Sequence, residues 1–209
     1  MGRYADRMKM SRQEHWENIY STKADAEVSW TLPDPHASLT LIREACPSGH
    51  VIDVGGGTSV LVDRLLETGY NVAVLDISEA AIDRCRKRLG THSDQVRWVV
   101  GDVTAILDVG TFDVWHDRAV FHFLTGYADR RAYVKLLTRT LRSGGHAVIA
   151  TFALDGPQEC SGLTVCRYDG QTLAAELRTA FSLIRSVSET HVTPWGKPQS
   201  FQYSLFRRN

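Results

Sequence analysis

The sequence predicts an α/β fold of three layers, in which helices cover both faces of a seven-stranded, mostly parallel sheet with an antiparallel last strand. Between residues 50 and 152, short apolar segments alternate with segments of helical periodicity, which is typical of βα units around a parallel sheet. Beyond residue 180, a short connection joins two more apolar segments. Such a connection suits antiparallel strands, because a parallel return needs a long crossover. The 209 residues suit one domain of this kind.

Ahead of the main domain, which we expect to span residues 47–209, residues 1–46 are expected to form a helical cap or lid. Residues 11–20 and 36–46 have the apolar spacing of helices, and a proline-containing stretch separates them. The region has more aromatic side chains than a linker needs, and they are expected either to pack over the domain edge or to close over a ligand. These side chains are Trp16, Tyr20 and Trp30.

Five strands, with helices between them, are expected in the central part of the chain. Gly69 is a suitable stop for the first of these helices, and Ser78 a suitable N-cap for the second. Asp129 is expected to cap the helix that precedes the fifth strand. The expected strands are residues 50–54, 71–77, 95–100, 112–116 and 147–152.

The last part of the chain changes in character. An irregular connection is expected over residues 154–166, followed by a helix over 169–180. Two strands, 183–192 and 200–206, are then expected to pair antiparallel across a short turn.

The composition bears on the class of partner and on the compartment. Lysine and arginine together number 24, as do aspartate and glutamate, so no net charge draws the chain to nucleic acid or to anionic membranes. No run of 18 apolar residues is present, so no membrane span is expected. Cysteines at irregular spacing fit a reducing compartment, and we expect a cytoplasmic protein that is a monomer or a weak dimer. The cysteines are Cys46, Cys85, Cys160 and Cys166.

A metal site is not expected. Cys160, Cys166 and His191 are the candidate ligands, but the two cysteines do not have the spacing of a zinc motif and a fourth ligand is missing.

Glycines and acidic residues stand where three of the predicted strands end. The first strand leads into Asp53-Val54-Gly55-Gly56-Gly57-Thr58, where glycine permits a sharp turn and lets a ligand approach the backbone amides. The next two strands end at Asp76 and at Gly101-Asp102. Because the carboxyl ends of parallel strands meet at one edge of a sheet, these groups predict a nucleotide-type cofactor site.

Four segments resemble the motifs of the class I S-adenosylmethionine-dependent methyltransferases, whose Rossmann-like sheet ends in an antiparallel hairpin: residues 51–58, 74–78, 99–103 and 112–117. The resemblance implies S-adenosylmethionine as the cofactor and S-adenosylhomocysteine as its product. It also implies that Asp53 lies near the methionine amino group, that Asp76 accepts the ribose hydroxyls, and that Asp102 reads the adenine edge. The other implied contacts are the backbone at Gly55 and Gly57, Ile77 on the adenine face, the Val103 amide, and Asp117 at the strand end that faces the methyl group.

A nicotinamide enzyme is the main alternative, because Asp76 follows the glycine turn at about the spacing of the ribose-binding acid in dinucleotide folds. Asp53 argues against it, since an acid there would face a pyrophosphate that needs amides and a positive helix end. A sulfonium cofactor with an amino group tolerates that acid. The chain is also short for a separate catalytic domain.

The catalytic candidates are His116, Asp117 and His122, at or just beyond the end of the fourth strand, where a base would have to lie. A thiol acceptor ionises near neutral pH and does not require such a base. A structural role is the alternative for either histidine, and pairing with Arg118 or capping of the next helix for Asp117. The segment departs from the Asn/Asp-Pro-Pro-Tyr pattern of methyltransferases that act on nucleic-acid amino groups, which argues against DNA or RNA as substrate.

Residues 15–20 and 28–30 resemble the N-terminal region of two groups in this family: thiopurine, thiol and metalloid methyltransferases, and protein-lysine methyltransferases of similar size. The resemblance implies that Trp16, Tyr20 and Trp30 cover the cofactor. We expect an enzyme that transfers a methyl group to a small-molecule acceptor, such as a thiol or metalloid, by in-line displacement. The alternatives are a protein-lysine methyltransferase and a protein that binds the cofactor without catalysis.

Overall fold

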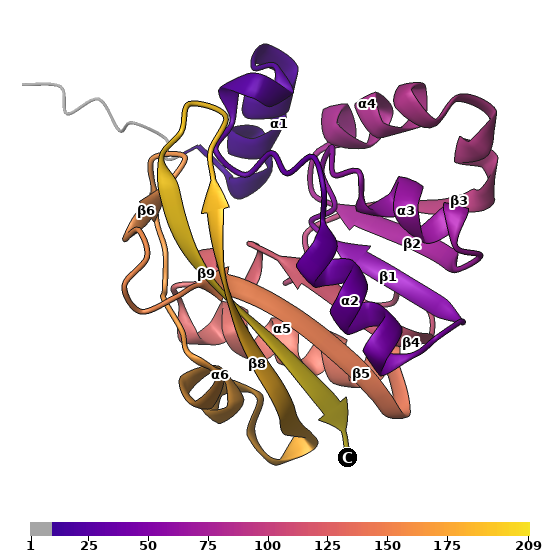
Figure 1. Ribbon diagram of the computed structural model, residues 1–209, viewed down its shortest axis with the longest axis vertical. Coiled ribbons are helices and arrows are strands. Elements are labelled where there is room, and N and C mark those ends of the chain that lie inside the picture. The colour runs from indigo at the N-terminus through magenta and orange to yellow at the C-terminus, as the bar shows by residue number, and fades with distance from the viewer. Residues whose placement is uncertain (1–9) are drawn as a thin grey trace, which may run out of the picture.

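A seven-stranded sheet forms the centre of the computed structural model, which describes residues 10–209 (Figure 1). Its strands are β1 (His50–Val54), β2 (Asn71–Asp76), β3 (Val96–Val100), β4 (Phe112–Arg118), β5 (Leu141–Phe152), β8 (Phe181–Val192) and β9 (Pro198–Arg208). They lie in the order β3-β2-β1-β4-β5-β9-β8. Because β9 runs antiparallel to both β5 and β8, it is the reversed strand in an otherwise parallel sheet. The predicted fold class is confirmed.

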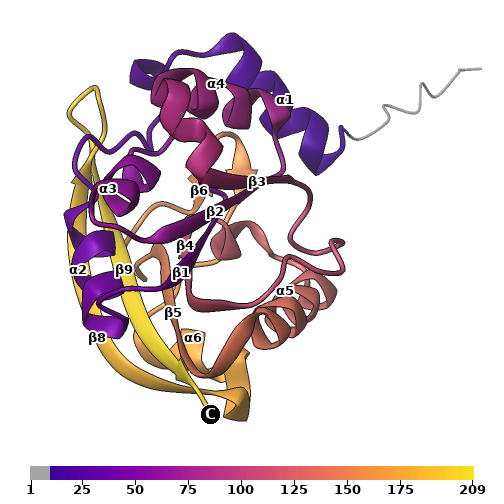
Figure 2. The ribbon, with the colours of Figure 1, turned by 90° about the vertical axis from the view of Figure 1, so that its right-hand side faces the viewer.

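Helices cover both faces of this sheet, which gives the expected three layers (Figure 2). One face is covered by α2 (His36–Ala45), α3 (Leu61–Glu67) and α4 (Glu79–Leu89), and the other by α5 (Tyr127–Thr140) and α6 (Gly170–Leu177). Helix α1 (Arg12–Thr22) packs beside α4, over the strand ends. Short 3-10 turns complete the connections: η1 (Asp25–Glu27), η2 (Gly90–Gln95), η3 (Phe121–Phe123) and η4 (Arg178–Ala180). None of the helices between residues 10 and 209 is long and apolar enough to cross a membrane.

Of the two predicted N-cap residues, one is confirmed and the other is wrong. The Ser78 hydroxyl accepts a hydrogen bond from the Ala81 amide at 3.2 Å, so its role as the N-cap of α4 is confirmed. The prediction that Asp129 caps α5 is wrong, because that helix begins earlier and its N-cap residue is Gly126. Asp129 lies in the first helical turn, where its carboxylate pairs with Arg12.

The strands at the centre of the sheet are longer than expected. β4 continues to Arg118, which pairs with Ala150, and β5 begins at Leu141 directly after α5. Residues 154–166, expected to be irregular, contain a short antiparallel hairpin whose strands, β6 (Glu159–Cys160) and β7 (Leu163–Thr164), have two residues each. The extension of β4 matters for the site, because alternation along the strand places His116 and Arg118 on one side and Asp117 on the other.

Candidate active site

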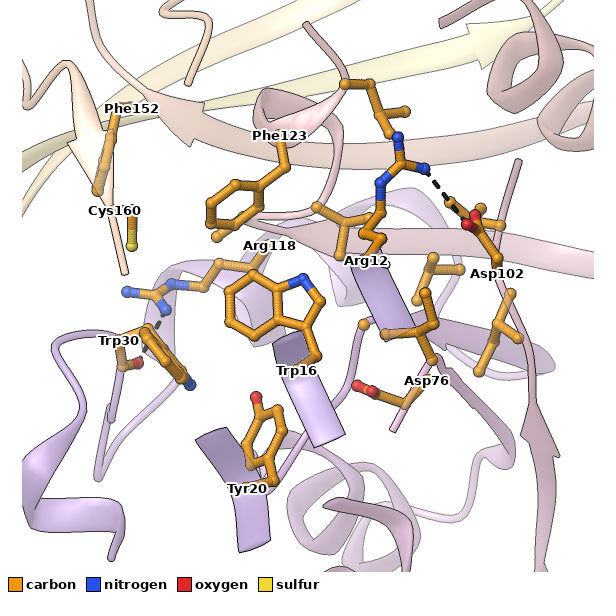
Figure 3. A pocket seen from close by; sticks show the side chains of 18 of the residues that line it. Arg12, Trp16, Tyr20, Trp30, Asp76, Asp102, Arg118, Phe123, Phe152 and Cys160 are labelled. Atoms are coloured by element: carbon orange, nitrogen blue, oxygen red, sulfur yellow. Dashed lines mark hydrogen bonds and ion pairs between the residues drawn. The ribbon is translucent and has the colours of Figure 1, made fainter. Parts of the chain in front are cut away.

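A pocket lies where β1, β2 and β4 end, beneath α1 (Figure 3). Its lining combines aromatic side chains from the N-terminal region with backbone and acids from the strand ends. Most of the predicted cofactor-binding residues are therefore brought together in one place. Those in the lining are Trp16, Tyr20, Trp30, Gly55, Asp76, Ile77, Asp102 and Val103.

The turn after β1 has a backbone geometry that favours glycine. Gly55 and Gly57 have φ values of 66° and 53°, in the left-handed region that side chains disfavour. A side chain at Gly55 would also collide with Val120, and one at Gly57 with the Tyr20 hydroxyl. Although Gly57 lies outside the pocket lining, its amide donates a 2.8 Å hydrogen bond to Oδ2 of Asp76. This bond fixes the turn to the end of β2.

Asp76 is a buried carboxylate at the end of β2. Its Oδ1 accepts a hydrogen bond from the Ser78 amide at 2.8 Å, and its Oδ2 accepts the one from Gly57. Burial raises the pKa of Asp76 to about 6, although these amide bonds act to lower it. Each oxygen keeps a second lone pair, so the carboxylate can still accept from the two hydroxyls of a ribose.

Asp102 follows β3 and is held by its own loop and by α1. Its Oδ1 accepts from the amide and the hydroxyl of Thr104, both at 2.7 Å. Its Oδ2 lies 3.3 Å from a guanidinium nitrogen of Arg12, which also pairs with Asp129 at 2.7 Å. No motif or spacing in the sequence indicates a role for Arg12. This residue connects α1 to the side of the pocket where adenine is expected.

Asp53 and His116 lie beside this pocket, in the lining of an adjoining cavity. The Nδ1 atom of His116 is 2.7 Å from Oδ1 of Asp53, and its Nε2 atom is 2.9 Å from the hydroxyl oxygen of Ser38. All three side chains are buried. Because both ring nitrogens are engaged, this arrangement is better suited to orienting Asp53 than to taking a proton from an acceptor.

Asp117 lies outside the lining of both cavities. Its Oδ1 accepts from the Val120 amide, and its Oδ2 accepts from the Phe121 amide at 3.1 Å and from the Tyr133 hydroxyl at 2.6 Å. Burial raises the pKa of Asp117 to about 6. These contacts fix the turn that follows β4 and leave the carboxylate no approach to the pocket.

His122 is fully buried behind the pocket wall, between the rings of Phe123 and Phe152. Burial, assisted by the charge of Arg118, lowers the pKa of His122 to about 3, so the imidazole is neutral at physiological pH. Phe123 and Phe152 line the pocket, whereas His122 does not. Its position therefore suits packing of the wall.

Helix α1 is fixed over the site through α4. The Glu17 carboxylate accepts from the Ser78 hydroxyl at 2.7 Å and from the Ala80 amide at 3.2 Å, which places an acid at the positive N-terminus of α4. At the other end of α1, Arg84 donates to the carbonyls of Tyr20 and Lys23. Within residues 10–46, the part that covers the pocket is therefore α1 and the segment up to Trp30, whereas α2 packs on the sheet.

Aromatic rings from this cover meet a ring from the main domain inside the pocket. The Trp16 ring lies 5.6 Å from that of Trp30 and 5.0 Å from that of Phe123, both edge to face. The Tyr20 ring lies 6.1 Å from that of Trp30. The hydroxyl of Tyr20 has its pKa raised far above the usual range by burial, so it stays neutral.

The half of the pocket away from Asp76 and Asp102 contains residues that were not among the predicted cofactor-binding or catalytic residues, although Cys160 was considered as a metal ligand. Two of them are the last residues of β4 and β5, and this position at a strand end is the sequence signal that could have found them. The others come from η3, from the short hairpin and from the first half of β9. The residues in question are Arg118, Phe123, Phe152, Cys160 and Phe201. Among residues 10–209, no cluster of three or more histidine, cysteine or acidic side chains could hold a metal ion.

Comparison with known proteins gives the class of this site. Residues 52–149 match the family model described as a methyltransferase domain. Together with the sheet order, this match supports a class I S-adenosylmethionine-dependent methyltransferase fold for the part of the chain that contains β1 to β5.

Individual relatives match only part of the chain. Nodulation protein S of Rhizobium tropici is 30% identical over 117 residues, which are 56% of this chain and 49% of that protein. The ubiquinone/menaquinone biosynthesis C-methyltransferase of Paracoccus denitrificans is 31% identical over 109 residues, 50% of this chain and 42% of that protein. The chain thus matches about half the length of these curated relatives or less.

Solved structures share the fold over nearly the whole chain. A structure from a study of the conversion of a disulfide bond into a thioacetal group during echinomycin biosynthesis has a TM-score of 0.79 at 21% identity, covering 94% of this chain and 93% of that one. The N-methyltransferase NodS of Bradyrhizobium japonicum, in complex with S-adenosylhomocysteine, has a TM-score of 0.73 at 16% identity, covering 95% and 99%. The 1,6-didemethyltoxoflavin N1-methyltransferase of Burkholderia thailandensis has a TM-score of 0.68 at 21% identity, covering 92% and 81%.

Proposed function

We propose that this protein binds S-adenosylmethionine in the pocket under α1 and transfers its methyl group to a small-molecule acceptor. The observation that carries the proposal is the arrangement of Asp76 and Asp102 at neighbouring strand ends, beside the glycine turn and opposite the aromatic cover. The membership of residues 52–149 in the methyltransferase family supports it. The structural relative crystallised with S-adenosylhomocysteine shares this fold.

Each group in the pocket has a role in this proposal. Asp76 accepts the ribose hydroxyls, and its amide partners, Ser78 and Gly57, hold it in place. Ile77 packs on one face of the adenine, while Asp102 and the Val103 amide bind its edge. Asp53, oriented by His116, attracts the methionine ammonium group across the glycine turn. The aromatic rings of Trp16, Tyr20 and Trp30 stabilise the sulfonium charge by cation–π attraction.

The bound cofactor supplies a methyl group on a sulfonium centre. The acceptor nucleophile attacks the methyl carbon in line, the carbon–sulfur bond breaks, and S-adenosylhomocysteine is the leaving group. The protein contributes position and exclusion of water, because α1 closes the pocket and the rings surround its interior. His116 is engaged at both nitrogens, and His122 and Asp117 lie outside the pocket lining. We therefore infer that the acceptor reacts without a dedicated histidine base, which favours a nucleophile that is soft or already ionised, such as a thiol.

The size and lining of the site favour a small acceptor. The apolar side chains Phe123, Phe152 and Phe201 line the inner end of the pocket. One structural relative is named for methylation of a small molecule, 1,6-didemethyltoxoflavin, another is named an N-methyltransferase, and a third comes from a study of a sulfur group in echinomycin biosynthesis. We propose a thiol, metalloid or similar nucleophile on a partly apolar molecule.

Calorimetry and a turnover panel test this function. We expect S-adenosylmethionine and S-adenosylhomocysteine to bind at micromolar concentration, and Asp76→Ala to weaken both at least tenfold. The control is Asp83→Ala, which changes an exposed acid on α4. Micromolar binding of NAD with no binding of either sulfur compound would overturn the proposal.

The panel uses methyl-labelled S-adenosylmethionine with thiols, selenite, amines and a protein extract. Labelled small products support the acceptor class proposed here. Label confined to lysine residues of proteins would replace it with protein-lysine methylation, and binding without turnover on every substrate would leave a cofactor-binding protein.

A further inference from the structure

Arg118 is the last residue of β4 and donates from two of its three guanidinium nitrogens. Its Nε donates to the Tyr203 hydroxyl at 3.0 Å, and Nη1 donates to the Trp30 carbonyl at 3.1 Å. The guanidinium carbon lies 4.4 Å from the centre of the Phe201 ring, so one face of the group is covered. These contacts from two separate parts of the chain, the segment of Trp30 and strand β9, hold the group in a fixed orientation.

The third nitrogen, Nη2, is buried and has no hydrogen-bond partner among residues 10–209. Nor does any acidic side chain in this part of the protein form an ion pair with Arg118. Burial raises the pKa of the Tyr203 hydroxyl and the Glu189 carboxylate raises it further, but among residues 10–209 Glu189 makes no ion pair with the guanidinium. Nη2 is thus a buried donor on a half-buried cation, and such a donor is costly to leave unused unless an anion joins it.

The surroundings of Arg118 indicate where that anion comes from. Arg118 lines the inner half of the pocket with Phe152, Cys160 and Phe201, across the Trp16 ring from Asp76 (Figure 3). The Trp30 side chain, which also lines the pocket, lies beside Arg118. The result is an apolar, largely aromatic compartment with one oriented guanidinium group, which is the chemistry that recognises an aryl or alkyl carboxylate.

We propose that Arg118 is an oxyanion-binding residue, which holds a carboxylate of the ligand in the inner half of the pocket through Nη2. This proposal rests on the proposed function for the existence of a bound ligand. Either the acceptor or the cofactor can supply this carboxylate. The acceptor supplies the carboxylate if it occupies the compartment of Phe152 and Phe201, and the cofactor's methionine tail supplies it if that tail reaches the cavity of Asp53, which Arg118 also borders.

The acceptor source is tested with matched pairs of aryl carboxylates and amides on the protein saturated with S-adenosylhomocysteine. The probes are benzoate and benzamide, phenylacetate and phenylacetamide, and indole-3-acetate and its amide. We expect at least one carboxylate to bind more than tenfold tighter than its amide, and Arg118→Met to abolish that difference. Arg185→Met is the control, because Arg185 is an exposed arginine paired with Glu44 at the far edge of the sheet.

The cofactor source is tested with S-adenosylhomocysteine and its decarboxylated analogue, S-adenosyl-3-thiopropylamine. If Arg118 holds the methionine carboxylate, the analogue binds the unaltered protein at least tenfold more weakly, and Arg118→Met brings the two affinities together. The proposal is overturned if neither the matched pairs nor these two nucleosides are distinguished by the unaltered protein. It is also overturned if Arg118→Met keeps every preference for a carboxylate that the unaltered protein shows in these two comparisons.

The two wild-type comparisons decide the matter even if Arg118→Met does not fold. Arg118→Lys keeps the charge without the planar group, and we expect it to retain only part of the preference for carboxylates. Failure of the unaltered protein to bind S-adenosylhomocysteine would overturn the proposed function itself. Binding of S-adenosylhomocysteine with no carboxylate preference overturns only the role of Arg118.

Discussion

His116 lies directly opposite Asp53 on the neighbouring strand, with its Nδ1 atom 2.7 Å from Oδ1 of the carboxylate. The other ring nitrogen, Nε2, lies 2.9 Å from the hydroxyl oxygen of Ser38, which belongs to α2. The parallel register of β1 and β4 creates this pair, since it places residues 53 and 116 side by side on one face. We interpret His116 as a residue that orients Asp53 rather than as a base.

Replacement of His116 by alanine should therefore weaken cofactor binding and spare the chemical step. We expect the dissociation constant of S-adenosylhomocysteine to rise about tenfold, or ~1.4 kcal/mol, because Asp53 loses its partner and can turn away from the methionine ammonium group. The methyl-transfer rate at saturating cofactor should change less than threefold. His92→Ala is the control, because this exposed histidine lies in η2, after the C-terminal end of α4, and lines neither cavity. A large fall in the saturated rate with unchanged affinity would instead identify His116 as a catalytic base.

Asp76 should make cofactor affinity dependent on pH. Burial raises its pKa to about 6, and the protonated acid loses part of its ability to accept ribose hydroxyls. Affinity for S-adenosylhomocysteine should hence fall as the pH is lowered through 6, by about tenfold between pH 7.5 and pH 5. Calorimetry across this range measures the change. Asp76→Asn should bind weakly and with no such slope, and an unaltered slope in that variant would assign the titration to another group.

The same residue should affect stability in the opposite sense. Between the unfolded pKa of 3.8 and the folded pKa of about 6, the folded protein binds a proton at Asp76 that the unfolded chain does not. The contribution of Asp76 to the free energy of unfolding therefore rises as the pH falls through this window. The free energies of unfolding of the unaltered protein and of Asp76→Asn are measured with urea at pH 7 and pH 5. Relative to the value for Asp76→Asn, the value for the unaltered protein should be higher at pH 5 than at pH 7.

Much of the cofactor half of the site could be predicted from sequence, because its residues stand where successive strands end. The glycine turn, Asp76 and Asp102 each occupy such a position, and parallel strands bring their ends to one edge. The mostly parallel sheet followed from the alternation of strands and helices. Local pattern therefore suffices for groups that the backbone itself positions.

The inner half of the pocket depends on contacts between distant parts of the chain, and local pattern does not encode these. Arg118 is placed there by Trp30 and Tyr203. On the adenine side, Arg12 is likewise placed by the distant residues Asp102 and Asp129. Asp117 could be assigned to the opposite face from His116 by strand alternation. That its oxygens would be taken by two amides and Tyr133 depended on how α5 and the turn after β4 pack.

The attachment of α1 to α4 should control how fast the cofactor leaves. Glu17 bonds the Ser78 hydroxyl and the Ala80 amide at the N-terminus of α4, so Glu17→Ala removes about 1 kcal/mol from this contact. We expect the dissociation rate of S-adenosylhomocysteine, followed by tryptophan fluorescence in stopped flow, to rise about fivefold. Deletion of residues 1–30 removes the cover entirely and should weaken affinity at least tenfold.

Glu79→Ala is the matched control for this contact. Glu79 is exposed in the first turn of α4, so its charge acts on the same helix end, and among residues 10–209 it forms no hydrogen bond or ion pair with α1. An equal rise in both variants would mean that the charge at the helix end matters and that closure by α1 does not. Unchanged affinity after the deletion would show that residues 1–30 are not a cover for the cofactor.

Tyr133 should report whether Asp117 has any part in catalysis. Its buried hydroxyl accepts from the Trp115 indole nitrogen at 2.8 Å and donates to Oδ2 of Asp117 at 2.6 Å. Tyr133→Phe therefore leaves the indole donor without a partner and removes one of the two hydrogen bonds to that carboxylate oxygen. We expect a loss of about 2 kcal/mol in the free energy of unfolding, measured with urea. Because Asp117 fixes the turn after β4 and lies outside the pocket lining, the saturated methyl-transfer rate should stay within twofold. Tyr127→Phe, at an exposed tyrosine that accepts from Arg178, should change neither quantity. A fall in rate of more than tenfold in a Tyr133→Phe protein of normal stability would return Asp117 to the catalytic residues.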